Sequence, residues 1–396
     1  MLTHEATQSS ETFLTASIMR NVPVQTNERS VKPVWSPEDT YLEVATRCLV
    51  SLCSAVGFSP EQQAGALVIL RDLLEPWGNQ AIGVRPSGNS DITDEHFPIE
   101  FSLAVEDGVP EVRILFEAQA EVFQPRDLWR AAWVVCERIE EWYGVPLDRL
   151  RKVADLFEPT SPAAHYAMWH GVSFSPKGPP KFKVYLNPLA QGEERAPTVI
   201  RETLARLGFA SAMQDVFADC ADGELRFFSL DLSASTTARA KVYRVHYNST
   251  REEIEAWLKC VPSFSPEAVD EFWRTISGPE ERFSRRPVST YLSLDSKDQH
   301  PSTGTIHFPV RSYANDDFEV RERVRKFLSS EDLELYERAL DTFANHRPLS
   351  AGIGLQSYVA MRLHPGERHV TIYLSPEAYT IEPPREMSGL ELRTAS

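Results

Sequence analysis

Four basic residues of this sequence fall on segments that alternate between apolar and polar side chains, as β-strands with one buried face do. They are Arg113, Lys183, Arg239 and Lys241. In Lys181–Asn187, Phe182 and Val184 share one face of such a strand, and Lys183 lies on the other. If the polar faces enclose a cavity, cations gathered there need an anionic partner, and a diphosphate has the matching size and charge. The pattern therefore predicts a diphosphate-binding cavity.

Tyrosines share these polar faces and would line the same cavity. The set is Tyr185, Tyr243, Tyr291, Tyr358 and Tyr373. Their π faces can stabilise a cation and keep water away from it. A cavity that binds a diphosphate and shelters a carbocation suits prenyl transfer. In that reaction an allylic C–O bond ionises, basic residues hold the leaving diphosphate, and an electron-rich aromatic ring attacks the cation.

Two more polar residues on these faces are predicted to be catalytic. Glu100 lies between Ile99 and Phe101, and His307 follows Ile306 in the same alternating manner. A buried carboxylate is costly unless a group donates a hydrogen bond to it. The alternative from a different class is a barrel that binds an anionic isoprenoid without turnover. Glu100 and His307 favour the enzyme, because a carrier needs no buried base.

Five hairpins would position these residues. Turn signals such as Asp107-Gly108 and Pro365-Gly366 separate the paired strands. The strand pairs are Pro98–Val105 with Glu111–Glu117, Met168–Phe174 with Lys181–Asn187 across Lys177-Gly178-Pro179-Pro180, Arg226–Leu232 with Arg239–Tyr247, Val288–Asp295 with Thr303–Pro309, and Gln356–Leu363 with His369–Ser375. The hairpins recur roughly every 60–70 residues, which indicates an architectural repeat.

Helical segments separate the hairpins. They are Arg126–Tyr143 with Leu147–Phe157, Pro197–Leu207 with Ala212–Asp219, Arg251–Leu258 with Pro266–Ile276, and Phe318–Phe327 with Asp332–Phe343. Two more helices precede the first hairpin, and Ser36 and Ser59, each followed by Pro, are expected to cap them. We expect an α+β fold, a ten-stranded antiparallel β-barrel of five ααββ-type repeats surrounded by a ring of α-helices. An open sheet with a solvated polar face is the alternative, but it would leave edges to protect.

Charge and composition argue against several classes of function. The net charge is −16, and such a surface repels nucleic acid. No apolar run approaches the roughly 20 residues that span a bilayer, and the first residues lack the pattern of a signal peptide. The five cysteines show no CxxC spacing, so neither disulfides nor structural zinc are expected. We expect a cytoplasmic protein that binds neither nucleic acid nor membrane.

No cofactor is expected either. Magnesium-dependent prenyl synthases carry aspartate-rich motifs that hold the metal. The nearest candidate here, Asp316-Asp317-Phe318-Glu319-Val320, lacks the final acid and begins a helix, where acids are favoured in any case. Walker-type and GxGxxG loops are also missing from the sequence. Arg and Lys side chains would take the place of magnesium.

In the order of its motifs, the sequence resembles the aromatic prenyltransferases of the dimethylallyltryptophan synthase type. The resemblance covers about residues 37 to 380. It rests on Glu100 in Phe97-Pro-Ile-Glu-Phe-Ser102, Arg113 in Val-Arg-Ile, Lys183-Val-Tyr185, and Arg239-Ala-Lys-Val-Tyr243. It implies the family's αββα barrel and the metal-independent transfer of a dimethylallyl group from dimethylallyl diphosphate to the indole ring of L-tryptophan. The compact length is more similar to bacterial members, which implies free tryptophan rather than a cyclic dipeptide, and a monomer or homodimer.

The resemblance also implies roles for single residues. Glu100 would accept a hydrogen bond from the indole N–H, and Arg226 would pair with the carboxylate of the amino acid. The backbone carbonyls near Ile92 and Thr93 would meet its amine. The basic residues named above would grip the diphosphate, and Tyr185, Tyr243, Tyr358 and Tyr373 would surround the dimethylallyl group.

Two positions depart from the family pattern. His307 stands where members often carry Tyr, so it could take the arenium proton or bind diphosphate. Asn187 replaces an aromatic residue that often helps to hold the carboxylate. A phenolic acceptor, such as tyrosine or a naphthalene, is the alternative to indole.

The chain is expected to form one barrel domain over residues 34–380. Residues 1–33 are predicted to be a disordered leader and residues 381–396 a flexible tail. Among the other polar residues, Arg362 should face inward and pair with an acid such as Glu117. His170, His246 and His369 are expected to be structural.

Overall fold

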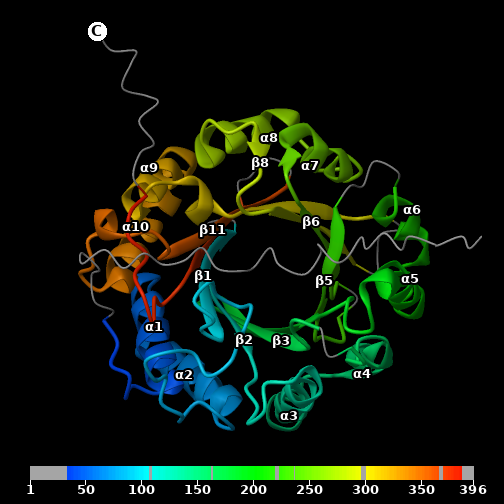
Figure 1. Ribbon diagram of the computed structural model, residues 1–396, viewed down its shortest axis with the longest axis horizontal. Helices are drawn as coiled ribbons and strands as arrows, with labels where there is room; N and C mark the ends of the chain where they lie inside the picture. The colour runs from blue at the N-terminus through cyan, green and yellow to red at the C-terminus, as the bar shows by residue number, and fades with distance from the viewer. Residues whose placement is uncertain are drawn as a thin grey trace, which may run out of the picture. The chain divides into compact units, whose positions relative to one another are not determined.

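A closed barrel forms the centre of the fold. The computed structural model describes residues 34–106, 109–161, 164–218, 223–235, 237–295, 300–364 and 369–385. Within these residues ten strands close into an antiparallel barrel in the order β1-β12-β11-β10-β9-β6-β5-β4-β3-β2 (Figure 1). They are β1 (Ile99–Glu106), β2 (Val109–Glu117), β3 (Met168–Ser175), β4 (Gly178–Leu186), β5 (Glu224–Asp231), β6 (Ala240–His246), β9 (Val288–Leu294), β10 (Thr303–Phe308), β11 (Gln356–Arg362) and β12 (His369–Leu374). The fold class expected from the sequence is confirmed.

Strand pairing follows the predicted hairpins and closes between the first and last strands. Phe101 of β1 lies opposite Leu374 of β12, so neither strand has an open edge there. Between β6 and β9, the chain forms a separate two-stranded sheet of β7 (Ser249–Thr250) and β8 (Arg282–Phe283).

The second hairpin turns earlier than expected. β4 begins at Gly178, which pairs with Ser175, so Pro179 and Pro180 lie in the strand instead of the turn. The ladder between β4 and β5 begins only at Lys183. A proline lacks a backbone N–H, and it is tolerated where the neighbouring strand does not require one.

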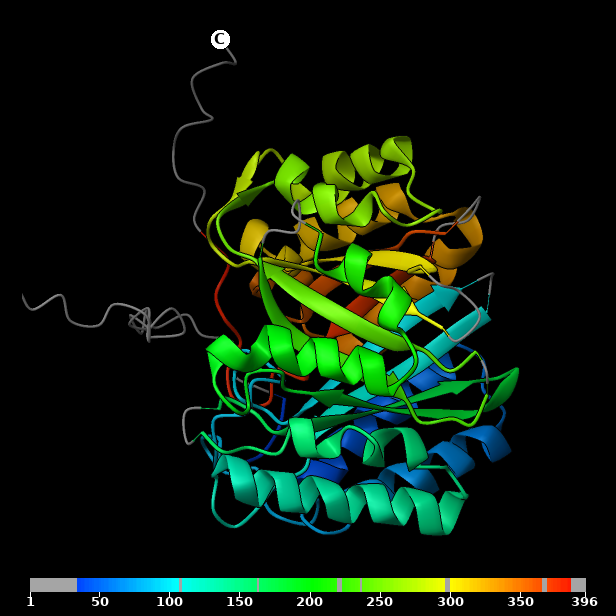
Figure 2. The same ribbon diagram turned by 90° about the vertical axis from the view of Figure 1, so that its right-hand side faces the viewer.

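Helix pairs surround the barrel in chain order (Figures 1 and 2). They are α1 (Tyr41–Ala55), α2 (Pro60–Leu74), α3 (Pro125–Tyr143), α4 (Asp148–Arg151), α5 (Ala196–Arg206), α6 (Met213–Val216), α7 (Arg251–Leu258), α8 (Pro266–Phe272), α9 (Asp317–Phe327) and α10 (Ser330–Ala344). A π-helical turn, Trp273–Ser277, follows α8. No helix in the described ranges has both the length and the apolar character to cross a membrane.

Two predicted helices are much shorter in the structure because side chains bind the carbonyls that would continue them. At the end of α4, Arg206 donates to the Lys152 carbonyl at 3.1 Å. At the end of α6, Arg244 from the barrel donates to the Val216 carbonyl at 3.0 Å. A carbonyl bound in this way no longer needs the N–H of the next helical turn.

Of the two predicted helix caps, the one at α2 is confirmed and the one at α1 is wrong. Ser59 and Gln62 form the capping box expected at α2. At α1 the cap is Thr40, which forms its own capping box with Glu43, and Ser36 lies four residues too early. The Ser36 backbone N–H instead bonds Asp39 in the turn before the helix.

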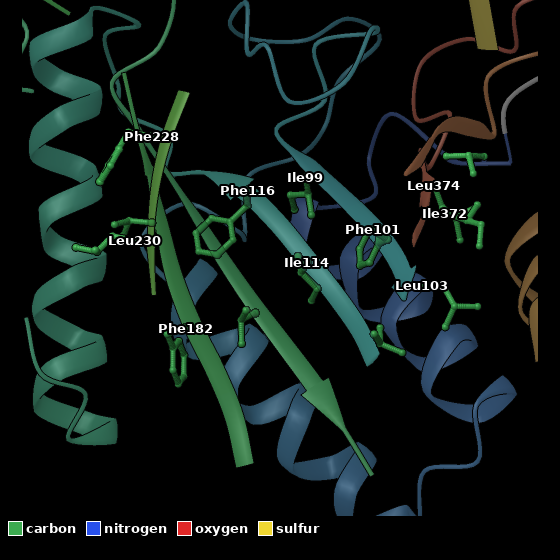
Figure 3. Packing of buried hydrophobic residues seen from close by; sticks show 14 of the residues in the cluster. Ile99, Phe101, Leu103, Ile114, Phe116, Phe182, Phe228, Leu230, Ile372 and Leu374 are labelled. Carbon is green, nitrogen blue, oxygen red and sulfur yellow. The ribbon is translucent and has the colours of Figure 1, made fainter. Parts of the chain in front are cut away.

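The main hydrophobic core fills the layer between the barrel and the helices. Apolar side chains on the outer faces of the strands point to the helices in Figure 3. The labelled set is Ile99, Phe101, Leu103, Ile114, Phe116, Phe182, Phe228, Leu230, Ile372 and Leu374. This arrangement confirms the predicted alternation and leaves the polar faces to line the interior.

The described chain extends past the predicted end of the domain. Ile381 is buried, and the Ile353 N–H donates to the Glu382 carbonyl at 2.9 Å. The Arg385 N–H donates to the Asn315 carbonyl at 2.8 Å. Residues 381–385 therefore pack on the barrel domain, while the leader predicted for 1–33 and the rest of the tail lie outside the described residues.

Removing a ring from the core layer should destabilise the fold. Phe101 is fully buried and packs on Phe343 of α10 at a centroid distance of 5.8 Å. We expect Phe101→Ala to lower the free energy of unfolding by about 3–5 kcal/mol. Phe318→Ala, in a half-exposed side chain of α9, should change it by less than about 0.5 kcal/mol. Urea denaturation measures both, and equal effects would contradict the core assignment.

Candidate active site

The four predicted cations meet at one cavity inside the barrel. Arg113 comes from β2, Lys183 from β4 and Lys241 from β6, and Arg239 directly precedes β6. The lining residues are Arg113, Lys183, Arg239, Lys241, Tyr291, Thr305, His307, Ala360, Arg362, His369, Thr371 and Tyr373. Because the barrel is closed, residues far apart in sequence converge here from its different strands.

Enclosure of these cations lowers the pKa of both lysines. Burial and, to a smaller extent, the nearby charge of Lys241 together lower the pKa of Lys183 to about 7. The pKa of Lys241 also falls well below its usual value, through burial and the charge of Arg239. A bound polyanion would reverse both effects by favouring the protonated amines.

Two carboxylates that the sequence did not assign to this cavity accompany the cations. Asp231 accepts from Arg239 Nε at 3.0 Å, and Glu111 accepts from Arg113 Nη2 at 2.8 Å. Burial alone would raise the pKa of Asp231, but the charges of Arg239, Lys183 and Lys241 hold it well below its usual range. Likewise Arg113 and Lys181 outweigh burial at Glu111, whose pKa falls to about 2.

Asp231 lies on the regular part of β5, although it was not singled out from the sequence. The register of β5 against β6 shifts earlier, between Leu225 and Phe227. Past this shift the two faces alternate, so Leu230 packs in the outer core, and Asp231, opposite Lys183 in the β4–β5 ladder, faces the cations.

The predicted tyrosines form a belt next to the cations. The ring centroids of Tyr243 and Tyr291 are 4.8 Å apart, and those of Tyr185 and Tyr243 are 6.0 Å apart. Tyr373 and Tyr358 continue the belt at 6.2 Å. Lys241 Nζ lies 4.3 Å from the Tyr291 ring centroid. The electron-rich faces are therefore already close to positive charge.

His307 completes this belt between two tyrosines. Its ring centroid lies 5.4 Å from that of Tyr291 and 5.3 Å from that of Tyr373. Burial lowers the pKa of His307 to about 3, and the charges of Lys241 and Arg113 contribute. The imidazole is thus neutral at pH 7, and its Nε2 lies 3.4 Å from the Tyr373 hydroxyl.

Glu100 lies further along the barrel and is buried as predicted. Its Oε1 accepts from Ser357 Oγ at 2.9 Å. Burial raises the pKa of Glu100 to about 8, opposed by Ser357 and reinforced by the charge of Asp94. Ser357 was not predicted, because it lies where the register between β11 and β12 shifts. A carboxyl group with this pKa is poised to ionise when a stronger donor arrives.

An aromatic cluster not singled out in the sequence adjoins Glu100. Leu115 lies opposite Glu100 in the β1–β2 ladder. It packs with a small cluster that is separate from the main core: Ile92, Tyr166, Trp169, Leu115, Tyr185 and Phe227. Tyr166 and Trp169 have centroids 4.2 Å apart. This apolar wall suits a flat aromatic acceptor.

Arg226 and the loop around Ile92 lie at this same end. Burial raises the pKa of Asp91, next to Ile92, and the charge of Arg226 opposes this rise. Arg226 itself pairs with Glu224 at 3.2 Å. Thr93 Oγ accepts from the Phe97 N–H at 2.8 Å, so its side chain shapes the loop.

Several polar residues have other partners than expected. Arg362 faces inward but meets His369 Nδ1 at 2.6 Å, whereas Glu117 accepts from Trp169 Nε1 at 3.2 Å. His369, which was expected to be structural, lines the cavity. Asn187 donates to the Tyr166 carbonyl at 2.7 Å and so braces the backbone.

Two of the three histidines expected to be structural pack outside the lumen. His170 stacks on Phe116 of the outer core at 5.3 Å, and burial lowers its pKa to about 3. His246 lies 2.8 Å from Thr290 Oγ. Both expectations are confirmed.

The acidic pair that begins α9 serves the fold. Asp316 caps α9 by accepting from the Glu319 N–H. Asp317 pairs with Arg347 at 2.8 Å and accepts from the backbone N–H groups of Gly354, Leu355 and Gln356. Across the described ranges, no three His, Cys, Asp or Glu side chains form a group that could hold a metal ion.

Comparison with known proteins agrees with this geometry. Residues 38–342 match the family described as tryptophan dimethylallyltransferase. The structure is similar to 6-dimethylallyltryptophan synthase from Micromonospora olivasterospora in complex with DMASPP and Trp (30% identity, 87% of this chain and 99% of that one, TM-score 0.81). It is also similar to the prenyltransferase PriB in complex with L-tryptophan and dimethylallyl thiolodiphosphate (32% identity, 88% and 99%, TM-score 0.81).

A sequence relative matches over a shorter stretch. The prenyltransferase anuH of Penicillium roqueforti is 28% identical over 129 residues, which is 31% of this chain and 26% of that protein. The chain therefore matches about a quarter of the length of this curated relative.

The barrel, its helix pairs and the cation-lined cavity define the class of αββα-barrel prenyltransferases. Within that class, the chain belongs to the tryptophan dimethylallyltransferase family.

The lysine pKa predicts how anion binding depends on pH. Lys183 is protonated below its pKa of about 7, so above pH 7 a diphosphate must bind together with a proton. We expect the affinity for dimethylallyl thiolodiphosphate to fall by up to about tenfold per pH unit from pH 7 to 9. Calorimetry across this range measures it. Lys183→Met should make the dependence shallower, and the part due to Lys241 should remain. Lys177→Met, in the exposed turn of the same hairpin, should leave the dependence unchanged.

Proposed function

We propose that this protein transfers a dimethylallyl group from dimethylallyl diphosphate to the indole ring of L-tryptophan. One observation carries the proposal: a single lumen holds a cation cluster, a belt of tyrosines and a buried carboxylate, in that order along the barrel. The first suits a diphosphate, the second an allylic cation, and the third an N–H donor. Solved relatives bind L-tryptophan and a thiolodiphosphate analogue of the donor.

The reaction would begin at the cation cluster. Arg113, Lys183, Arg239 and Lys241 hold the diphosphate, and the allylic C–O bond breaks with its electron pair leaving on the diphosphate. The cations are fixed before the reaction, so they stabilise the charge that develops on the leaving group without reorganising. The dimethylallyl cation is then enclosed by Tyr185, Tyr243, Tyr291, Tyr358 and Tyr373, which exclude water.

The acceptor would react from the Glu100 side. The indole N–H donates to Glu100, and the carboxylate pushes electron density into the ring. An indole carbon attacks the cation to form the new C–C bond and an arenium ion. His307, neutral before the step, takes the proton from that carbon. The electron pair of the broken C–H bond returns to the ring and restores its aromaticity. Bound diphosphate offsets the charges of Lys241 and Arg113, which removes part of the cause of the low His307 pKa.

Tryptophan suits this site better than a phenolic acceptor. A phenol ionises to attack well, and a second negative charge would then meet Glu100. An indole keeps its N–H and gives a carboxylate the donor that it lacks. Arg226 and the loop at Ile92 lie where the charged groups of the amino acid would reach.

We further propose that the reaction needs no metal and takes place in the cytoplasm. Arg and Lys side chains supply the charge that magnesium would otherwise provide. Cys48, Cys53 and Cys136 are free thiols, which suits a reducing compartment.

Incubation with dimethylallyl diphosphate and L-tryptophan tests the function directly. Mass spectrometry should detect tryptophan that has gained one prenyl unit, at similar rates with and without EDTA. Tyrosine and a dihydroxynaphthalene serve as the phenolic arms. Transfer only to a phenol, or an unchanged acceptor in every arm, would overturn the proposal. Loss of turnover in EDTA that magnesium restores would overturn metal independence.

Glu100 should control transfer more than donor binding. The carboxylate form lies above its pKa of about 8, so kcat/KM for tryptophan at saturating donor should rise with pH toward that value. Glu100→Gln keeps shape but loses the charge, and we expect roughly 10²-fold slower transfer and no such rise. Glu100→Ala should nearly abolish transfer. In both variants the affinity for dimethylallyl thiolodiphosphate should stay near the wild-type value, and wild-type transfer rates would remove Glu100 from the mechanism.

A further inference from the structure

A residue without a side chain lies on the inner wall of the barrel. It is Gly171 of β3, between His170 and Val172. His170 stacks on Phe116 of the outer core, and Val172 belongs to that core. Because the two faces of a strand alternate, a side chain at position 171 would point into the lumen.

Gly171 occupies the middle of a row of residues that crosses five strands. Successive ladders pair Glu100 with Leu115, Leu115 with Gly171, Gly171 with Lys183 and Lys183 with Asp231. The row begins at the carboxyl group that would meet the indole N–H, and it ends at the cation cluster. Gly171 is therefore the direct neighbour of Lys183 on the side that faces away from Asp231.

The backbone at this position does not require glycine. Gly171 has no positive φ angle, so its backbone conformation is open to other residues. The register shift in the β3–β4 ladder lies further along, between Ser173 and Ser175. A glycine inside a regular strand weakens that strand, and it often marks a place where another group approaches closely. The structural reason for this glycine is therefore a neighbouring side chain.

The Lys183 side chain fills the space that a β-carbon at residue 171 would need. An ideal β-carbon there would lie 2.8 Å from Lys183 Cγ and 3.2 Å from Lys183 Cδ, whereas Tyr185 Cε2 would be at 3.5 Å, an ordinary contact. Carbon atoms in favourable contact are about 3.5–4.0 Å apart, so the first distance is a clash. The β-carbons of directly opposed residues are ordinarily about 4.5–5.5 Å apart. A γ-carbon this close shows that the lysine stem leans across β3, away from Asp231.

The direction of this stem determines what the ammonium group can bind. Asp231 lies on the other side of Lys183 and already accepts from Arg239 Nε at 3.0 Å. A lysine pushed toward β5 would compete with Arg239 for this carboxylate, and the acid would then neutralise its charge. A lysine that leans on β3 keeps its charge for an anion in the lumen.

We propose that Gly171 is a positioning residue for the diphosphate, because its missing side chain lets Lys183 lie against β3 and face the leaving group instead of Asp231. The inference rests on the proposed function, since it treats Lys183 as a ligand of the diphosphate. It deepens that function by adding a residue that acts only through its neighbour. Any side chain at position 171 would displace the lysine in the same direction.

A double-mutant cycle between Gly171 and Lys183 tests the inference. The affinity for dimethylallyl thiolodiphosphate is measured by calorimetry at pH 6, below the Lys183 pKa of about 7. Gly171→Ala and Lys183→Ala should each weaken binding by about 10- to 100-fold, the loss of one hydrogen bond to a charged group. Lys183→Ala removes the γ-carbon, so adding Gly171→Ala to it should change the affinity by less than about twofold.

A second glycine of the same hairpin provides the control. Gly178 begins β4, and an ideal β-carbon there would have no atom within 4 Å. Gly178→Ala should therefore bind the analogue within about twofold of the wild type. The urea midpoint of every variant reports folding. If Gly171→Ala alone does not fold, recovery of folding in the double variant with Lys183→Ala supports the inference, and a double variant that also fails to fold overturns it.

The results separate this inference from the proposed function. Wild-type affinity in Gly171→Ala, or losses that simply add in the double variant, overturns the inference while the proposed transfer to tryptophan stands. If Lys183→Ala binds the analogue as tightly as the wild type, Lys183 is not a diphosphate ligand and the inference falls with that assignment. Coupling between the two positions in an enzyme that prenylates only a phenol would support the inference and refute the proposed acceptor.

Discussion

Positive charge enclosed within a closed barrel is the constraint on which the rest of the structure depends. Lys183 and Lys241 are pushed toward their neutral forms by burial and by the charges of neighbouring cations. To keep such groups facing one another, their backbones must be held rigidly from several directions. Strands β2, β4 and β6 do this, because each is fixed on both sides by ladder hydrogen bonds. The layer of apolar side chains beneath the helices stabilises that frame (Figure 3).

The two carboxylates in the cation cluster hold the arginine side chains in place without cancelling the net positive charge of the cluster. Asp231 holds Arg239, and Glu111 holds Arg113. Among the described residues around the cavity, the cations still outnumber these two carboxylates. A guanidinium that is already oriented loses little freedom when an anion arrives. The site is therefore arranged for a leaving group whose negative charge grows during the reaction, which is the condition for electrostatic catalysis.

The alternation of residue types was sufficient to predict the barrel, its inner face and the meeting of Lys183 with Lys241. A period of two determines the face of every residue in a regular strand. It fails where strands are irregular, and Ser357, which bonds Glu100, lies at such a shift. Asp231 lies on a regular part of β5 and follows the alternation, but no local pattern showed that it would meet Arg239. The early ends of α4 and α6 were not predicted, for a different reason. Arg206 and Arg244 bind their last carbonyls from elsewhere in the fold, which no local pattern reports.

Charge is sorted along the barrel, and this sorting orients the reactants. The diphosphate is drawn to the end that holds Arg113, Lys183 and Lys241, while the opposite end presents the apolar wall around Trp169. A zwitterionic acceptor has the reverse preference, because its ammonium is repelled by the cations and its indole fits the apolar wall around Trp169. Each substrate thus has one favourable end, and the indole ring meets the allylic cation at the tyrosine belt between them. Which ring carbon reacts then depends on where along the barrel the amino acid is bound. The groups that bind its ammonium and carboxylate therefore determine the position of the indole ring, although they do not contact that ring.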